Sequence, residues 1–216
     1  MGTGFVASQA EVNLTEEGIT MSLRSDFELD LDGTLTRPGD PGWDEARQAW
    51  NLAVDQRPDA VATVASVRDV QSVVNAARSA GLRVAAQSTG HNASPLDDLV
   101  GTVLLRLARL RSVSIDPVRR TARVEGGAQW SDVTSAAAPY GLAALAGSSG
   151  DVGVIGYTLG GGVSWLARSH GLAANHVTSF DAVTADGEIR RVDESHEPDL
   201  FWALRGGGGS FAVVTA

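Results

Sequence analysis

The sequence predicts an α+β fold, and three observations lead to this prediction. An amphipathic helical segment lies between two short apolar segments, residues 60–65 and 82–86, that are typical of strands. Later strands follow one another directly, and two of them, residues 177–184 and 188–192, flank an Asp-Gly pair that predicts a hairpin. The chain contains no Gly-x-Gly-x-x-Gly pattern, which disfavours a doubly wound dinucleotide-binding fold.

The helix between the first two strands carries signals at both ends. Ser66 is a suitable N-cap with Asp69 three residues later, and Gly81 stands where glycine ends many helices. One face of this helix is expected to be buried, because apolar residues recur on it at helical spacing: Val70, Val73, Val74 and Ala77.

The remaining elements are predicted from the same patterns. Residues 1–40 are polar and interrupted by turns, so we expect a poorly ordered segment there and one domain over residues 41–216. A short helix carrying Trp50 is predicted at residues 44–54. The other predicted elements, in chain order, are strands at 102–107, 112–115 and 121–125, a helix at about 131–139, a glycine-rich region at 147–162, a helix at 199–205 and a strand at 211–215.

Composition excludes several classes of protein. A formal net charge of −9 argues against a surface for nucleic acid or anionic membranes. The absence of cysteine excludes disulfides and thiolate sites, and the absence of lysine excludes Walker-type nucleotide loops and Schiff-base chemistry. Exclusive use of arginine is typical of a GC-rich genome, so a bacterial source is expected. Neither a membrane span nor a signal peptide is recognisable, so a cytoplasmic location is expected.

Two loops have the composition of a ligand site. The first follows a predicted strand, and the second, residues 147–162, has seven glycines in 16 positions. Glycines let backbone amides approach a ligand, and the serine and threonine hydroxyls add donors, which suits a pyrophosphate joined to a flat polar ring. Two flexible loops that bind nothing are the alternative. The residues of the first loop are Gln87, Ser88, Thr89, Gly90, His91 and Asn92.

Other roles for the histidines have weaker support. His91 could be a structural histidine that is hydrogen-bonded within its turn. A serine–histidine catalytic triad lacks the G-x-S-x-G elbow, and a metal site lacks a Glu-x-x-His pairing. We interpret three further histidines as surface or supporting residues: His170, His176 and His196.

Three blocks in the chain resemble one family: QSTGH, GSSGDVGVIGYTLGGGVSWLARSHGLAANHV and DLFWALRGGGGSFAVVT. In this order they are similar to the berberine-bridge-enzyme-like flavin oxidases of the vanillyl-alcohol-oxidase superfamily of FAD-linked oxidases. The resemblance runs from about Trp50 to the end of the sequence. It implies a PCMH-type FAD-binding domain over residues 41–216, built of two α/β subdomains with the flavin between them.

The resemblance also implies how the flavin is attached. In that family the histidine of the first block is bonded to the flavin 8α-methyl group, and here this residue is His91. Many relatives have a second tether, a cysteine in the motif G-x-C-P-x-V-G. The matching segment here, residues 147–153, has Ser149 at the cysteine position and Gly150 at the proline position. FAD attached through His91 alone is therefore expected.

The same matching implies the remaining cofactor contacts. The amides of residues 88–92 would hold the pyrophosphate, and the small Val152 would favour access of O2 and an oxidase over a dehydrogenase. The isoalloxazine would be lined by Ser148, Val152, Gly153 and Gly156. The phosphates or adenosine would lie near Tyr157, Gly160 and Gly161, and the adenine near Gly171, Leu172 and Val177.

The implied function is an FAD-dependent oxidoreductase. It would take hydride from a C–H beside O or N in a small molecule such as an alcohol, sugar or secondary metabolite, and O2 would then be reduced to H2O2. The family's substrate domain, its catalytic base and its C-terminal return segment would follow residue 216, so a missing C-terminal half or a partner chain is expected. A non-catalytic truncated flavin-binding module is the main alternative, and a nucleotide-sugar-binding relative without redox chemistry is a third.

Overall fold

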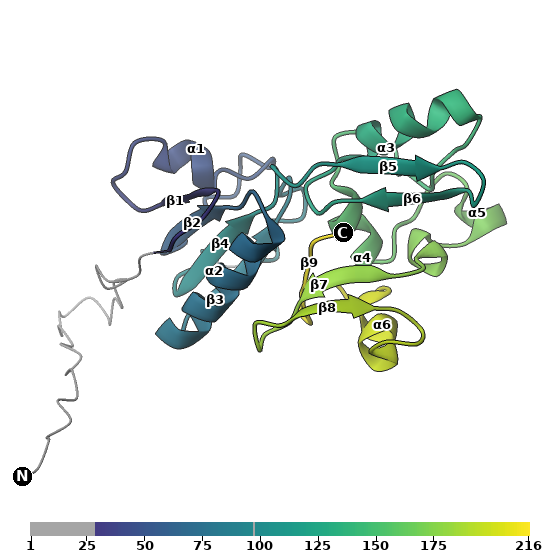
Figure 1. Ribbon diagram of the computed structural model, residues 1–216. Helices are drawn as coiled ribbons and strands as arrows, with labels where there is room; N and C mark the ends of the chain where they lie inside the picture. Colours follow the sequence, from purple (N-terminus) through teal and green to yellow (C-terminus); the bar gives the residue numbers. More distant parts are fainter. Residues whose placement is uncertain (1–28, 97) are drawn as a thin grey trace, which may run out of the picture.

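The computed structural model describes residues 29–96 and 98–216, which form two lobes lying side by side (Figure 1). A four-stranded sheet and two helices make up the first lobe, and a two-stranded and a three-stranded sheet with further helices make up the second. Residues 1–28 of the segment expected to be poorly ordered lie outside the described residues. None of the described helices is long and apolar enough to cross a membrane.

The first sheet has a parallel centre and an antiparallel edge. Its order is β1-β2-β4-β3, and β4 pairs in parallel with both of its neighbours. Strands buried on both faces are expected to be apolar, and β2 and β4 are apolar except at their ends, with buried runs at residues 60–62 and 103–105. The strand bounds are Thr34–Thr36 for β1, Ala60–Thr63 for β2, Arg83–Gln87 for β3 and Thr102–Arg106 for β4.

The edge strand β1 lies within the stretch for which poor order was expected. The carboxylate of Asp69 accepts hydrogen bonds from the amides of Asp32 and Gly33, both at 3.0 Å, and Leu35 packs against the buried core. These partners are far away in the sequence, so no local pattern could indicate them.

Helix α2 (Val67–Ala80) confirms its predicted signals. The Ser66 hydroxyl accepts a hydrogen bond from the amide of Asp69 at 3.1 Å, and Gly81 ends the helix with a φ of 70°. All four residues of the predicted apolar face are buried: Val70, Val73, Val74 and Ala77.

The predicted helix at residues 44–54 is wrong in its extent. Helix α1 covers Trp43–Arg47 only, because Gln48 turns to an extended conformation with ψ 126°. Beyond it, the amide of Trp50 donates a hydrogen bond to the carbonyl of Thr89 at 2.9 Å. A tertiary contact with the histidine loop therefore replaces the helical hydrogen bonds expected there.

The second lobe confirms the predicted hairpin, in which β7 and β8 are joined through Asp186 and Gly187, with φ 83° at the glycine. The glycine-rich region at 147–162 differs from an open loop, because buried apolar residues at its centre form helix α4. The strands are β5 (Val113–Asp116), β6 (Thr121–Val124), β7 (Phe180–Val183), β8 (Ile189–Val192) and β9 (Val213–Val214). The helices are α3 (Trp130–Ala137), η1 (Ala138–Tyr140), α4 (Val154–Leu159), α5 (Ala167–His170), η2 (Ala173–His176) and α6 (Pro198–Leu204).

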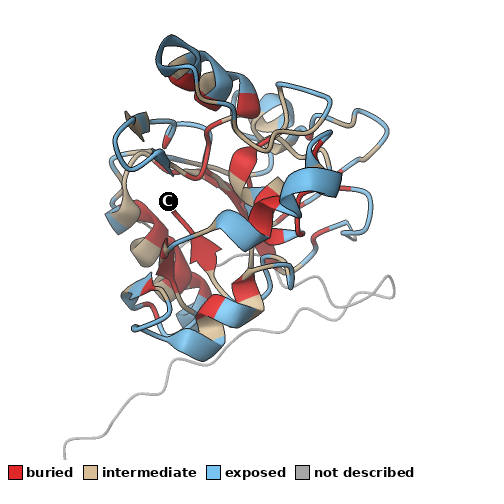
Figure 2. Cartoon of the chain, turned by 90° about the vertical axis from the view of Figure 1, so that its right-hand side faces the viewer, coloured by how far each residue is buried: buried red, intermediate tan, exposed pale blue. Residues whose placement is uncertain are grey.

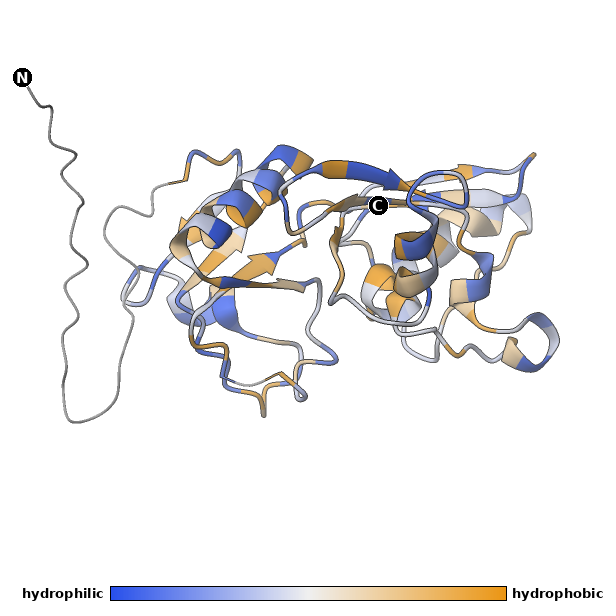
Figure 3. Cartoon of the chain, turned by 90° about the horizontal axis from the view of Figure 1, so that it is seen from below, coloured by the Kyte–Doolittle hydropathy of each residue, from blue (hydrophilic) through white to orange (hydrophobic). Residues whose placement is uncertain are grey.

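The two lobes share part of their core. Val183 of β7 and Val213 of β9 belong to the same buried cluster as the apolar face of α2. The side chain of Gln71 on α2 also donates a hydrogen bond to the carbonyl of Gly187 at 2.7 Å. Buried residues concentrate on the strands and the inner helix faces (Figure 2), and the most hydrophobic residues follow the same pattern (Figure 3). The lobes are therefore fixed relative to one another by packing.

Candidate cofactor site

The histidine loop begins at the carboxyl end of the parallel strand β3, where α/β sheets commonly bind ligands. Gln87, the last residue of β3, is buried and accepts a hydrogen bond from the side chain of Gln56 at 3.1 Å. Gly90 has a φ of 86°, and a Cβ there would lie 2.9 Å from both the Cβ of Ala49 and Nε2 of Gln87. The loop therefore turns tightly at Gly90, where the neighbouring Ala49 and Gln87 leave no room for a side chain.

The imidazole of His91 is held on three sides. Its Nδ1 lies 2.8 Å from the hydroxyl of Thr89, and its Nε2 lies 3.6 Å from Oδ1 of Asp151. The indole of Trp50 stacks on the ring, with 4.0 Å between centroids and 17° between planes. The side chain of His91 is 19% exposed, so the ring is anchored and still reaches the surface.

Asp151 joins the glycine-rich loop to the histidine loop. Its carboxylate accepts hydrogen bonds from the hydroxyl of Ser149 and, at 2.9 Å, from Nε1 of Trp50. The hydrogen bond from Ser149 is the main cause that holds the pKa of Asp151 below its usual range, and the bond from Trp50 adds to it against partial desolvation. Asp151 is therefore an anion at neutral pH.

The glycine-rich loop is fixed from behind by α3. The amide of Trp130 donates to the carbonyl of Val152 at 3.0 Å, and the amide of Ser131 donates to that of Gly150 at 2.8 Å. On the other side the loop touches the histidine loop so closely that a Cβ on Gly153 would lie 2.9 Å from the hydroxyl oxygen of Ser88. The two predicted loops, one from each lobe, thus meet at the junction of the lobes.

Unpartnered polar atoms at this junction fit a bound cofactor. The hydroxyl of Ser88 is buried and has no hydrogen-bond partner, a condition that usually indicates a ligand or water, and Nε2 of His91 has only its 3.6 Å contact with Asp151. Gly156 on α4 is exposed, and apart from its neighbours and the backbone of its own helix no atom lies within 4 Å of the place where its Cβ would stand. A hydroxyl, an imidazole and a helix face free of side chains suit FAD, whose phosphates need donors and whose ring needs a flat surface.

Tyr157 and Val152 are both half-buried and pack against neighbours in the second lobe. The ring of Tyr157 makes an edge contact with Trp130, with 5.3 Å between centroids, and its hydroxyl donates to the carbonyl of Leu145 at 3.2 Å. Burial raises the pKa of Tyr157. Val152 packs against the buried cluster around Trp130 and Val133.

The other predicted residues lie further along or outside the junction. Gly161 and Leu172 line a cavity of about 250 Å³ beside Trp202 and Arg205, beyond the C-terminal end of α4, where Gly160 caps the helix. Seven predicted residues are exposed at the surface: Asn92, Ser148, Ser149, Gly156, Gly160, Gly171 and Leu172.

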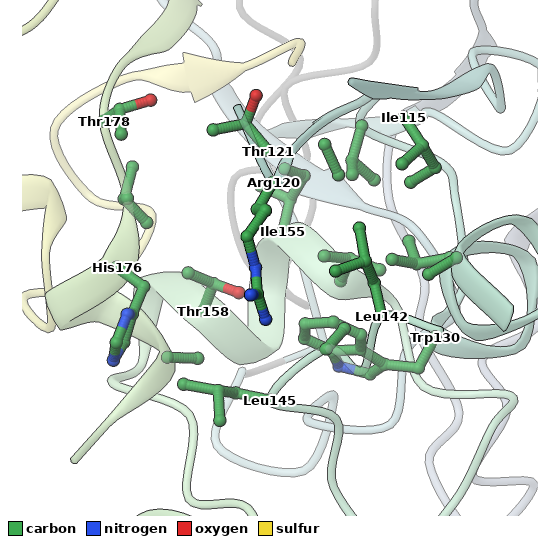
Figure 4. A pocket seen from close by; sticks show the side chains of 18 of the residues that line it. Ile115, Arg120, Thr121, Trp130, Leu142, Leu145, Ile155, Thr158, His176 and Thr178 are labelled. Carbon is green, nitrogen blue, oxygen red and sulfur yellow. The ribbon is translucent and has the colours of Figure 1, made fainter. Parts of the chain in front are cut away.

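A second cavity is a feature that sequence reasoning missed. It has a volume of about 340 Å³ and lies between β6, α3 and α4, with mainly apolar walls (Figure 4). Of the predicted cofactor residues only Val177 lines it. Arg120 reaches into it from the β5–β6 turn, between His176 and Trp130 (Figure 4). The cavity therefore belongs to the second lobe and not to the junction of the two loops.

Trp50 and Asp151 were also missed as site residues. Asp151 stands inside a loop chosen for its glycines and serines, so its position was a usable signal. Trp50 had none, because only the fold brings it to His91. Within residues 29–96 and 98–216, no group of three or more His, Asp or Glu side chains could hold a metal ion.

Comparisons with known proteins agree with this geometry. Residues 58–193 match the family model described as FAD binding domain. The chain is 35% identical over 195 residues to (R)-6-hydroxynicotine oxidase of Paenarthrobacter nicotinovorans, covering 90% of this chain and 43% of that protein. The crystal structure of 6-hydroxy-D-nicotine oxidase from Arthrobacter nicotinovorans superposes with a TM-score of 0.82 at 35% identity, over 89% of this chain and 42% of that one.

A third relative carries a named flavin linkage. A structure of glucooligosaccharide oxidase from Acremonium strictum, described with a 6-S-cysteinyl, 8α-N1-histidyl FAD, matches with a TM-score of 0.76 at 33% identity, over 85% of this chain and 39% of that one. The chain spans about two fifths of the length of these relatives. The family match covers more than half of the chain, and the mixed α/β fold agrees with it. The chain therefore belongs to the FAD binding domain family, as a PCMH-type FAD-binding domain of the berberine-bridge-enzyme-like oxidases.

Proposed function

We propose that this chain is the FAD-binding part of an oxidase and that it binds FAD covalently through His91. The observation that carries the proposal is the anchored imidazole at the junction of two loops from different lobes. Thr89, Trp50 and Asp151 fix the ring, and its partial exposure leaves it accessible to a flavin edge. Two of these partners, Trp50 and Asp151, come from segments that are distant in sequence from the histidine loop.

The attachment is proposed to be single. Ser149 occupies the position of the second tether in the matched motif, and the chain contains no cysteine that could form a thioether. The Ser149 hydroxyl is also engaged by the carboxylate of Asp151. This chain would thus differ from the glucooligosaccharide oxidase described with both a cysteinyl and a histidyl bond.

When bound, FAD supplies the redox chemistry, accepting hydride from a C–H beside O or N and reducing O2 to H2O2. The residues of this chain hold it. The hydroxyl of Ser88 and the amides of the loop would bind the pyrophosphate, and the face of α4 at Gly156 would lie against the ring. Relatives named as nicotine and glucooligosaccharide oxidases suggest cyclic amines or sugars as substrates. Those relatives are longer than this chain, and we propose that the proton acceptor and the substrate contacts belong to a region that corresponds to their additional residues.

The visible spectrum of the purified chain before and after acid precipitation tests this function. Yellow flavin that stays in the precipitate of the wild-type chain and is absent from that of His91→Ala would support a histidyl bond. His170→Ala, at an exposed histidine, is the matched control and should keep its acid-stable flavin. Flavin released by acid from the wild-type chain would contradict the covalent bond, and a folded but colourless chain would favour the non-catalytic alternative.

A further inference from the structure

The two ring nitrogens of His91 lie in different surroundings. Nε2 is buried and faces the carboxylate of Asp151 at 3.6 Å, whereas Nδ1 lies 2.8 Å from the hydroxyl of Thr89. A carboxylate can only accept, while a hydroxyl can also donate. Of the two neutral tautomers, only the one protonated at Nε2 satisfies both neighbours, because Nδ1 then accepts from Thr89.

The carboxylate of Asp151 is held in a fixed position beside Nε2 of His91. At 3.6 Å its contact with Nε2 is electrostatic and longer than a hydrogen bond, so its effect depends on a fixed and ionised carboxylate. Trp50 Nε1 donates to one oxygen at 2.9 Å, and Ser149 donates to the other. Trp50 also stacks on the imidazole, so one side chain aligns both the ring and the carboxylate.

We propose that Asp151 is a positioning residue for the covalent attachment of FAD: it keeps the proton on Nε2 of His91 and so leaves the lone pair on Nδ1 to form the bond. This inference rests on the proposed histidyl linkage. As the bond forms, the imidazole gains positive charge, and the carboxylate opposite Nε2 stabilises that charge until the proton leaves.

The step balances with reagents that the proposed function already contains. A bond forms between Nδ1 and the 8α carbon of FAD, while one C–H bond of the methyl group and the N–H bond at Nε2 break. The two electrons released reduce the flavin ring, which takes up two protons, and O2 then reoxidises the ring and forms H2O2. The hydroxyl of Thr89 must turn away from Nδ1 before the bond can form.

The first test needs no flavin. Long-range ¹H–¹⁵N spectra of the flavin-free chain report which nitrogen of His91 carries the proton, with His91→Ala identifying its signals. We expect the Nε2–H form in the wild-type chain and in Ser149→Ala, which keeps the carboxylate. In Asp151→Asn, whose amide can donate to Nε2, the Nδ1–H form should increase. Identical tautomers in the wild-type chain and Asp151→Asn would overturn the proposal.

The second test separates positioning from folding. Flavin-free chain is mixed with FAD, and total bound flavin after gel filtration is compared over time with acid-stable flavin. Asp151→Asn should bind FAD but attach it at least about tenfold more slowly, with partial rescue in Asp151→Glu. An unchanged rate in Asp151→Asn, or a parallel loss of bound and attached flavin, would refute the positioning role. If the wild-type chain never attaches flavin, the proposed histidyl linkage is wrong. The NMR spectra still show, independently of attachment, whether Asp151 keeps the proton on Nε2 of His91.

Discussion

The indole of Trp50 lies almost parallel to the imidazole of His91, with 4.0 Å between the ring centroids. The two residues are separated in sequence by β2, α2 and β3. The backbone of Trp50 is tied to the same loop, since its amide donates to the carbonyl of Thr89. Ala49 and Trp50, together called the clip below, therefore hold the histidine loop in place.

Trp50 contributes both a stacked ring and a hydrogen bond to Asp151, and two variants separate these contributions. Stacked aromatic pairs contribute roughly 0.5–1.5 kcal/mol, so Trp50→Ala is expected to weaken FAD binding by up to about tenfold. Trp50→Phe keeps a stacking ring but loses the hydrogen bond to Asp151, and its effect should be smaller. Titration of flavin fluorescence with flavin-free chain measures both. Equal affinity in Trp50→Ala and the wild-type chain would show that the stack does not shape the site.

Gly153 is expected to tolerate no side chain while Ser88 keeps its own. Its φ of −66° suits alanine, but the added Cβ would lie 2.9 Å from the Ser88 hydroxyl oxygen. Gly153→Ala should push the two loops apart and reduce the amount of FAD bound per chain. The single variant Ser88→Gly is the reference, because it lacks the hydroxyl that we expect to hold the pyrophosphate, and adding Gly153→Ala to it should cause little further loss of flavin. Absorbance of the gel-filtered chain reports the flavin bound per chain, and an equal loss from Gly153→Ala in the presence and absence of the Ser88 side chain would count against loop contact as the cause.

A cysteine at position 149 should create a second attachment. The thiolate is the reactive form of cysteine, and position 149 matches the second tether of the family motif. In a His91→Ala background, Ser149→Cys should therefore restore acid-stable flavin, and the mass of the chain should increase by one FAD. Ser79→Cys, at an exposed position on α2 outside the cofactor loops, is the control and should restore none. Flavin lost to acid from both variants would mean that this loop does not lie against the flavin ring.

Asp69 should make stability depend on pH. Burial alone would raise the pKa of Asp69, but hydrogen bonds from the amides of Ala65, Asp32 and Gly33 outweigh it and lower the pKa. A lowered pKa in the folded state gives stability that is present above the unfolded value of about 4 and is lost as the pH falls through the folded value. Asp69→Asn should lower the free energy of unfolding at pH 7 by about 2 kcal/mol or more.

Urea unfolding at pH 7 and at pH 3 checks the role of Asp69. The wild-type chain should lose stability between these conditions, and Asp69→Asn should lose less, so the two curves converge at low pH. Glu188→Gln, at an exposed carboxylate, should follow the wild-type chain. A constant difference between Asp69→Asn and the wild-type chain at both pH values would mean that the charge of Asp69 does not stabilise the fold.

Elements with local signals could be predicted from the sequence. Helix α2 has its cap, its apolar face and its final glycine within one continuous stretch, and the hairpin at Gly187 depends on two turn residues. Strand β1 could not be predicted, because it is held by Asp69 and by core contacts from distant segments. Helix α1 ends early for a related reason, since Trp50 has partners in another loop.

The residues of the candidate site also divide into those with local sequence signals and those that only the fold brings together. Its loops are visible in the sequence because glycine density and a histidine after a tight turn are local features. The contact of the clip with His91 could not be predicted, because only the fold brings Trp50 onto the imidazole. Helix α4 was hidden by the glycines around it, although Val154, Thr158 and Leu159 are buried at helical spacing.

The position of the clip changes where a working unit of this protein must begin. The family match starts at residue 58, but Ala49 and Trp50, which enclose Gly90 and His91, lie before it. The amides of Asp32 and Gly33, which bind Asp69, lie earlier still. A fragment cut at the family boundary for protein engineering would keep every glycine of the cofactor loops and lose the residues that hold them closed.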